Sequence, residues 1–163
     1  MAWPTDPKSL QVIDRIVEIL NDVIGGGPAY FYSPGGVIKG FAHYSTITKF
    51  PYYMVAFEGA SDRPIPCGDN QYHQTLAVSV KGWVDLEQGE SVSKLLRCVR
   101  DIQRAINEDT KSGAGATSLG VIACQCDIDT VEADSGFLAI EGRGFGYFDQ
   151  RVVVVIEGDW GEL

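Results

Sequence analysis

Cysteine and histidine are the residue types in this sequence best suited to metal binding or catalysis, and their spacing supports neither. Cys124 and Cys126 could offer two thiolates to zinc, but no second pair of ligands stands nearby in the sequence. In a strand, a spacing of two places both thiols on the face shared with Ile122 and Ile128. We therefore interpret the pair as buried small hydrophobic residues and expect free thiols.

The histidines and the glycine-rich segments form no catalytic or cofactor motif either. His43 and His73 lack a carboxylate and a nucleophile at a recognisable spacing, as acyl transfer would require. The glycines at 113–115 and 142–146 precede predicted strands, whereas a phosphate-binding loop must open a helix. We predict that the protein is not an enzyme and holds no cofactor or metal.

Acidic residues gather in one predicted strand. Asp127 and Asp129 alternate with Cys126 and Ile128, and an acidic strip continues at Glu132 and Asp134. A calcium site would need oxygen ligands at denser alternating positions in a loop. We interpret the strip as a solvated or lumen-facing surface.

Composition predicts one globular domain over residues 1–163. That length suffices for one hydrophobic core and is short for two. Hydrophobic residues make up 45% of the chain and charged residues 21%, as in folded proteins. With 13 Lys and Arg against 22 Asp and Glu, the formal charge is −9, which disfavours sequence-independent binding to nucleic acid.

Membrane and secretion signals are not recognisable in the sequence. No apolar run approaches the roughly 20 residues that span a bilayer, and the N-terminus lacks a basic segment followed by an apolar one. We expect no membrane contact, and a protein that stays in a cytoplasm unless it leaves within a larger particle.

Two amphipathic helices are predicted. The first runs from Asp6-Pro7, where Asp caps the free amides and proline fits the first turn, to the glycines at 25–27. Its apolar stripe consists of Leu10, Ile13, Val17, Leu20 and Ile24, widened by Ile16 and Val23. The second covers 91–108, and its core stripe consists of Val92, Leu95, Leu96, Val99, Ile102 and Ile106.

The polar side of the second helix is basic. Lys94, Arg97, Arg100 and Arg104 lie mostly off the core stripe, beside Asp101 and Glu108. Because opposite charges are interleaved there, we interpret this side as a solvated or subunit-facing surface rather than a phosphate site.

Hairpins dominate the predicted strands. Segments 52–57 and 74–85 should pair antiparallel, and later strands are expected at 121–131, 137–141 and 145–157, with irregular strand or loop around 37–41. Residues 152–156 are apolar on both faces, as in a strand covered on both sides. The order predicts an α+β fold: two helices packed on one face of a mostly antiparallel β-sheet with a long β-hairpin.

The connection predicted between the paired strands, residues 59–73, is far longer than hairpin closure requires. We expect it to contact another molecule. The candidate interface therefore combines hairpin residues with the helical arginines: Asp62, Arg63, Asp69, His73, Arg97, Arg100 and Arg104.

The order of these elements resembles the tail terminator family of long-tailed bacteriophages, which includes the minor tail protein U type and related tail-completion proteins. The resemblance covers nearly the whole chain and lies in an ordered set of features rather than one invariant motif. These are the helix Leu10-Gln-Val-Ile-Asp-Arg-Ile-Val-Glu-Ile-Leu20, Phe50-Pro51 entering a strand, the long hairpin, Trp83-Val84-Asp85, Arg100-Asp101-Ile102, a glycine-rich connector, and terminal strands ending at Val152-Val-Val-Val-Ile-Glu-Gly-Asp159.

The resemblance implies a structural virion protein. Members form a homohexameric ring that caps the tail tube, stops its polymerisation and offers a joining surface to the head-side connector protein. It implies three contacts, with the protein's own copies, the tail tube protein and that connector, and no catalytic residue. DNA would pass through an acidic lumen without specific binding. The location would be the head-proximal end of the tail, after assembly in the host bacterial cytoplasm.

Two other classes stay open. Another head-tail connector or head-completion protein would share this composition and bind a different ring. A small-ligand-binding or enzymatic α+β domain would instead have a pocket with convergent polar groups.

We predict that replacing Cys124 and Cys126 together with Ala or Val costs only packing, about 1 kcal/mol each, because both are interpreted as small apolar groups. Thermal melting of the double variant and elemental analysis of protein purified without added metal check this. A stoichiometric metal would contradict it.

Overall fold

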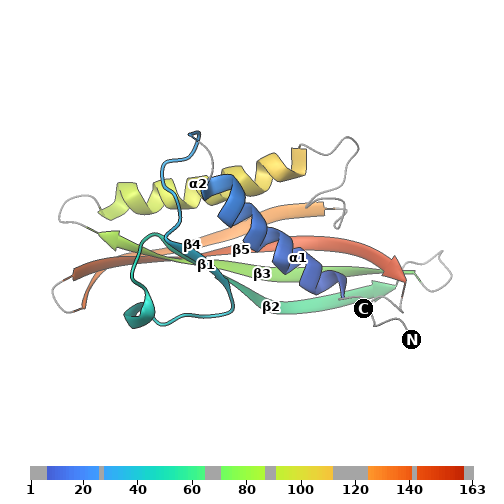
Figure 1. The fold of residues 1–163 in the computed structure, drawn as a ribbon. Helices are drawn as coiled ribbons and strands as arrows, with labels where there is room; N and C mark the ends of the chain where they lie inside the picture. The colour runs from blue at the N-terminus through green and yellow to red at the C-terminus, as the bar shows by residue number, and fades with distance from the viewer. Residues whose placement is uncertain are drawn as a thin grey trace, which may run out of the picture.

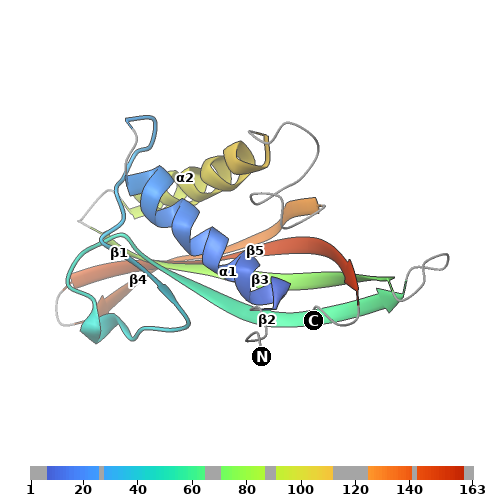
Figure 2. The ribbon, with the colours of Figure 1, turned by 45° about the vertical axis from the view of Figure 1, so that its right-hand side comes forward.

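One sheet carries both long helices on the same face (Figures 1 and 2). The computed structural model describes residues 7–25, 28–64, 71–86, 91–111, 125–140 and 143–159. The elements are α1 (Lys8–Glu18), a π-helical turn (Ile19–Ile24), β1 (Gly36–Lys39), a 3-10 turn (Tyr44–Thr46), β2 (Tyr52–Pro64), β3 (Gln71–Leu86), α2 (Ser91–Lys111), β4 (Gln125–Ile140) and β5 (Arg143–Asp159).

The sheet has five strands in the order β1-β2-β3-β5-β4. Short β1 runs parallel to β2, and every other pair is antiparallel. The longest pairing, between β3 and β5, extends from Gln71 opposite Asp159 to Leu86 opposite Gly144. The predicted antiparallel pairing of β2 with β3 is confirmed.

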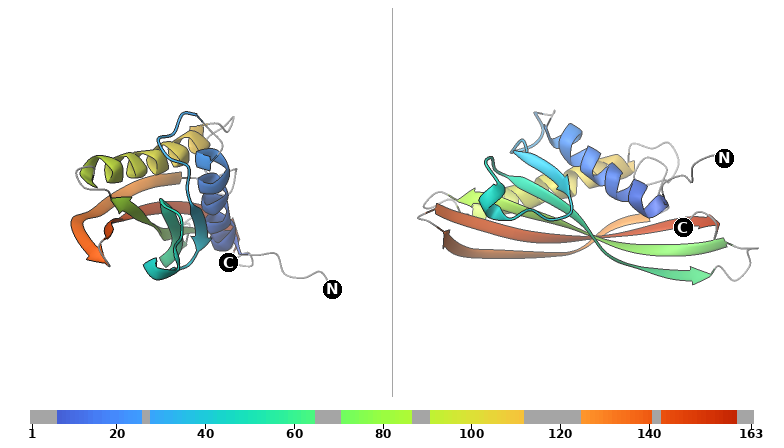
Figure 3. Two further views of the ribbon diagram at one scale, coloured as in Figure 1. Left: turned by 60° about the vertical axis from the view of Figure 1, so that its left-hand side comes forward. Right: turned by 60° about the horizontal axis from the view of Figure 1, so that its bottom comes forward.

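The core lies between this sheet and the two helices (Figure 3). Alternate residues of β3 and β5 point into it, including Leu76, Val78, Val80, Val152 and Val154, which are all fully buried. Period-two alternation on the strands and period-3.6 stripes on the helices meet in one apolar layer. The predicted fold class, two helices on one face of a mostly antiparallel sheet, is confirmed.

The buried face of α1 is rotated from the predicted stripe. Val12 and Ile16 are fully buried, whereas Ile13 and Val17 are only partly buried and pack at the edge of the core. The helix continues as a π-turn up to Gly25, so the predicted end near the glycines is confirmed. Asp6, the predicted cap, lies outside the described residues; the residue preceding the helix is Pro7, which makes no side-chain cap.

The prediction of a loop over 59–73 is wrong. β2 continues to Pro64 and β3 begins at Gln71, with Ser61 opposite Thr75 and Arg63 opposite His73. A register shift between Phe57 and Gly59 separates this distal part of the hairpin from the predicted strand. A bulge allows pairing to resume in a new register. The strands therefore continue through the polar residues that predicted a loop. Residues 65–70 lie outside the described ranges.

Two long strands replace the three predicted at the C-terminal end. β4 runs through the segment predicted as a connection, and its irregularity between Asp134 and Leu138 appears as a register shift rather than a turn. A second shift, between Ile128 and Thr130, leaves Asp129 without a partner on β5. The simple alternation expected for the acidic strip is therefore interrupted at Asp129.

The sheet face opposite the helices is covered only in part. At one end, loop 40–51 packs aromatic rings on it, with the Tyr44 ring 6.0 Å from that of Trp83 and the Phe50 ring 5.3 Å from that of Phe145. Toward the other end, Val153 and Val155 remain half-buried. Residues 152–156 of β5 were expected to be covered on both faces, and this holds only for the face toward the helices.

Of the residues predicted for the buried stripe of α2 whose side chains the structure describes, one lies outside the stripe, and two residues that were not predicted belong to it. Leu95, Val99, Ile102 and Ile106 are buried, as expected, but the Leu96 side chain is 57% exposed. Fully buried Cys98 and Ala105 complete the buried side instead, because the helix faces the sheet through positions centred near Ile102. The side chain of Val92 lies outside the described part.

The neighbouring leucines of α2 provide a direct test of this placement. Leu95→Asp would bury an unpaired carboxylate and should unfold the protein. Leu96→Asp should cost under about 1 kcal/mol, mainly through lower helix propensity. Urea denaturation at low protein concentration measures both, and equal losses of stability would contradict the orientation of α2.

Candidate functional site

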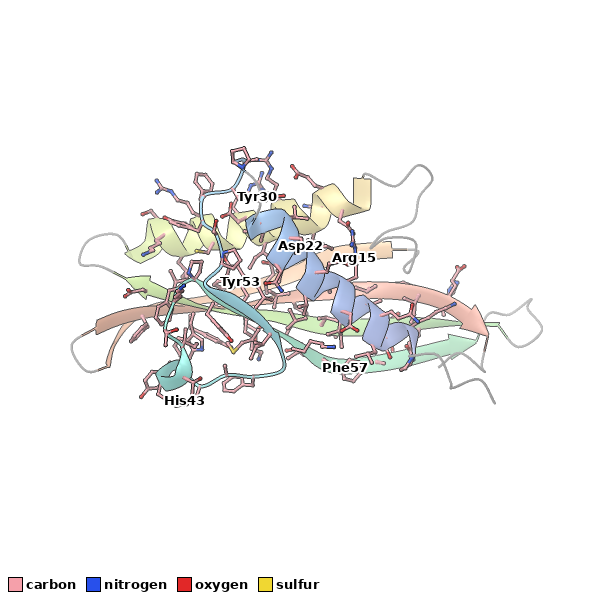
Figure 4. The ribbon with its side chains drawn as sticks, in the orientation of Figure 1. Arg15, Asp22, Tyr30, His43, Tyr53 and Phe57 are labelled. Carbon is pink, nitrogen blue, oxygen red and sulfur yellow. The ribbon has the colours of Figure 1, made fainter. Side chains whose placement is uncertain are left out.

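The outer side of α2 and the segment at 28–34 form one continuous surface. In Figure 4 the segment that carries Tyr30 passes in front of α2 on its way to the sheet. Helical periodicity turns Arg97, Arg100 and Arg104 to the solvent side, and all three are exposed. The predicted exposure of these arginines is confirmed.

Asp101 attaches the segment to the helix. Its side chain, from a residue only 2% exposed, accepts the Phe31 N–H at 3.1 and 3.0 Å and the Tyr32 N–H at 3.0 Å. Hydrogen bonds to a carboxylate are stronger than those between neutral groups, and these two amides have no other acceptor in the described residues. Asp101 therefore belongs to the fold rather than to the solvated charge cluster predicted from the sequence.

Two arginines reinforce this attachment. The Arg104 guanidinium lies 5.5 Å from the Tyr30 ring centroid, donates to the Ala29 carbonyl at 2.8 Å and pairs with Glu108 at 2.6 Å. Burial, followed by its hydrogen bond to Glu108, raises the pKa of Tyr30 to about 12, so the phenol stays a neutral donor. Arg97 lies over the Phe31 ring at 5.5 Å.

Arg100 differs from its neighbours. It is exposed, and within the described ranges it makes no hydrogen bond or ion pair. One turn earlier stands exposed Leu96, and on the far flank the Phe31 side chain is 60% exposed. We call the surface made by Phe31, Leu96, Arg97, Arg100 and Arg104 the arginine face.

The combination of apolar and arginine side chains on this face is typical of protein interfaces. Aromatic residues and arginine are enriched at the centres of interfaces, whereas lysine and acidic residues are depleted there. The sequence pattern predicts the exposed arginines but neither apolar member of this face. Leu96 was predicted to lie in the core, and no helical or strand pattern is recognisable around Phe31.

The hairpin candidates lie elsewhere, at the end of the sheet where β2 and β3 join (Figure 1). Arg63 stands opposite His73, whose Nε2 lies 2.6 Å from the Glu157 carboxylate, and Asp62 stands opposite Gln74. Asp69 is outside the described residues. The described members of the predicted interface therefore lie in two separate parts of the fold rather than one.

The sheet face away from the helices carries an open groove. Its walls come from β2, β3 and β5, and it is lined by Glu58, Gly59, Ala60, Ser61, Thr75, Ala77, Arg151 and Val153. No histidine or cysteine is among these residues, and nothing in the lining pairs a nucleophile with a base.

Groups suited to catalysis remain apart in the described part of the chain. No group of three or more potential metal ligands occurs there. His43 is exposed and uses Nδ1 locally, 2.8 Å from the Ser45 hydroxyl. Burial raises the pKa of Cys98 to about 12, so that this free cysteine is a protonated thiol at neutral pH.

No family model matches the chain, and no curated protein matches it. Among the helices that the structure describes, none is both long and apolar enough to cross a bilayer.

Asp101 should prove essential for holding the segment at 28–34. Asp101→Ala would leave the Phe31 and Tyr32 amides without their acceptor and should cost about 1–3 kcal/mol. Asp14→Ala, which removes an exposed carboxylate paired with Lys39, serves as control and should cost at most about 1 kcal/mol. Urea denaturation compares the two, and equal effects would contradict the role of Asp101.

Proposed function

We propose that this protein is a structural component of a bacteriophage tail: a tail terminator whose copies form a ring on the tail tube, end its polymerisation and join it to the head. The proposal starts from the resemblance in the order of elements. The α+β fold, with two helices on one face of a mostly antiparallel sheet, is the fold which that resemblance implies.

The observation that carries the proposal is the arginine face. It presents exposed apolar and cationic side chains on a chain whose formal charge is −9. A ring needs two different surfaces on each subunit that fit one another head to tail. A distinctive patch on an otherwise acidic molecule suits one half of such a contact.

The charge of the chain suits the passage of DNA. With the six subunits that the resemblance implies, six times −9 gives about −54, and phosphates are repelled rather than bound by such an assembly. The protein is proposed to act by assembly alone, without catalysis or cofactor.

Electron microscopy of the purified protein tests the ring. We expect ring-shaped particles with a central hole. Particles that stay monomeric in the presence of tail tubes and never cap them would contradict the terminator role.

Tail length tests the arginine face in assembly. In phage that express only the Arg100→Glu form, we expect overlong tubes without heads, because the reversed charge weakens subunit contact while the exposed position spares the fold. Lys49→Glu, an equal charge reversal at another exposed residue, should give normal tails. Normal tails with both variants would refute the contribution of Arg100.

A further inference from the structure

We propose that Phe31 and Leu96 are the apolar anchors through which the arginine face binds strand β4 of a second copy of this chain. This inference rests on the proposed ring and names the surfaces that close it. The partner surface is the acidic edge strand, with Asp127, Asp129, Glu132 and Asp134.

The anchors are among the most exposed large apolar side chains of the described residues. Phe31 is 60% exposed and Leu96 57%. The others are Phe41, at 67% in the loop after β1, and Phe57, at 52% on β2, and neither has an arginine over its ring. Among these four exposed side chains, Phe31 is the one with an arginine over its ring in the described part of the chain.

The anchors are held in place before any partner arrives. Asp101 fixes the backbone of Phe31, and Leu96 projects from a continuous helix. At 3.6 residues per turn, Leu96, Arg100 and Arg97 follow one another around the helix. Because Arg97 contacts the Phe31 ring, Arg100 lies between Leu96 and Phe31. A preordered patch loses little conformational entropy on docking.

Charge identifies β4 as the surface that this patch meets. The 16 residues of β4 include four carboxylates and no Lys, Arg or His. β4 is also an edge strand, paired on one side only within the described residues. An edge strand with an acidic sequence suits a partner that brings arginines and a few apolar contacts.

The contact must form between molecules. α2 packs on the sheet over β4 and β5 with its buried side, so the exposed arginine face of a given copy points away from that copy's own β4. Contact between two different surfaces of identical chains repeats around an axis and closes into a ring when the rotation allows.

Nucleic acid suits the arginine face less well than a second copy of the chain does. Arg97 and Arg104 are already engaged with Phe31, Tyr30 and Glu108, which leaves Arg100 as the member without a contact in the described part. Affinity for DNA depends on several cations that neutralise phosphates, and the whole chain is strongly acidic.

Sedimentation velocity of the purified full chain over a range of concentrations tests the anchors. We expect Phe31→Ser and Leu96→Ser each to weaken self-association about tenfold or more, as loss of an interface anchor does. Phe41→Ser and Phe57→Ser are the matched controls and should associate like the wild type. Circular dichroism and melting confirm that each variant is folded, and Phe31→Tyr should retain association.

A second variant tests the partner strand. Changing Asp127, Asp129 and Asp134 to Asn together with Glu132→Gln removes the negative charge of β4 and should weaken association as much as Arg100→Glu does. Added salt should weaken the wild type in the same direction. Undiminished association of the neutralised variant would overturn β4 as the partner.

The outcomes separate this inference from the terminator role. A wild type that stays monomeric at every concentration, or anchor variants that associate normally, overturn the inference even if Arg100→Glu lengthens tails. Association lost with the anchors while tails stay normal keeps the inference and refutes the terminator role. If the wild type binds a 20-base-pair DNA duplex and Arg100→Glu loses that binding while its self-association is unchanged, the arginine face belongs to nucleic acid and the inference is overturned.

Discussion

Burial of one face of the β3–β5 pair beneath both helices is the constraint on which the rest of the structure depends. Val78, Val80, Val152 and Val154 cannot leave water unless α1 and α2 cover them from the same side. One side of α2 is therefore buried against the sheet, and the other side faces solvent. The arginine face lies on that exposed side.

The segment at 28–34 shows how a buried charge can serve a surface. The Asp101 carboxylate accepts hydrogen bonds from the backbone N–H groups of Phe31 and Tyr32. These hydrogen bonds replace those to water and offset the cost of burying the carboxylate. The same bonds hold the Phe31 ring outward next to Arg97. A core interaction thereby determines the shape of a region that has no regular secondary structure.

The sheet offers a contrasting surface. Its helix face is closed by the core, whereas the opposite face is covered by aromatic residues only toward one end, and the acidic strand β4 forms an edge. Long edge strands invite pairing with other chains, and charge along them restricts which chains can pair. The proposed self-association rests on this contrast between the basic and apolar side of α2 and the acidic sequence of β4.

The sequence by itself determined the fold class, because the periods of helices and strands are local and read directly from residues such as Leu95, Ile102, Val78 and Val80. It also indicated the exposure of Arg97, Arg100 and Arg104.

Only the tertiary structure decided where the hairpin strands end, which leucine of α2 is exposed and what Asp101 does. Pairing with β5 and a bulge carry β2 and β3 through a polar stretch whose composition predicts a loop. Packing on the sheet orients α2 so that Leu95 is buried and Leu96 is not, although the two are adjacent and chemically identical. The partners of Asp101 lie about 70 residues away in the chain, beyond the reach of any local pattern.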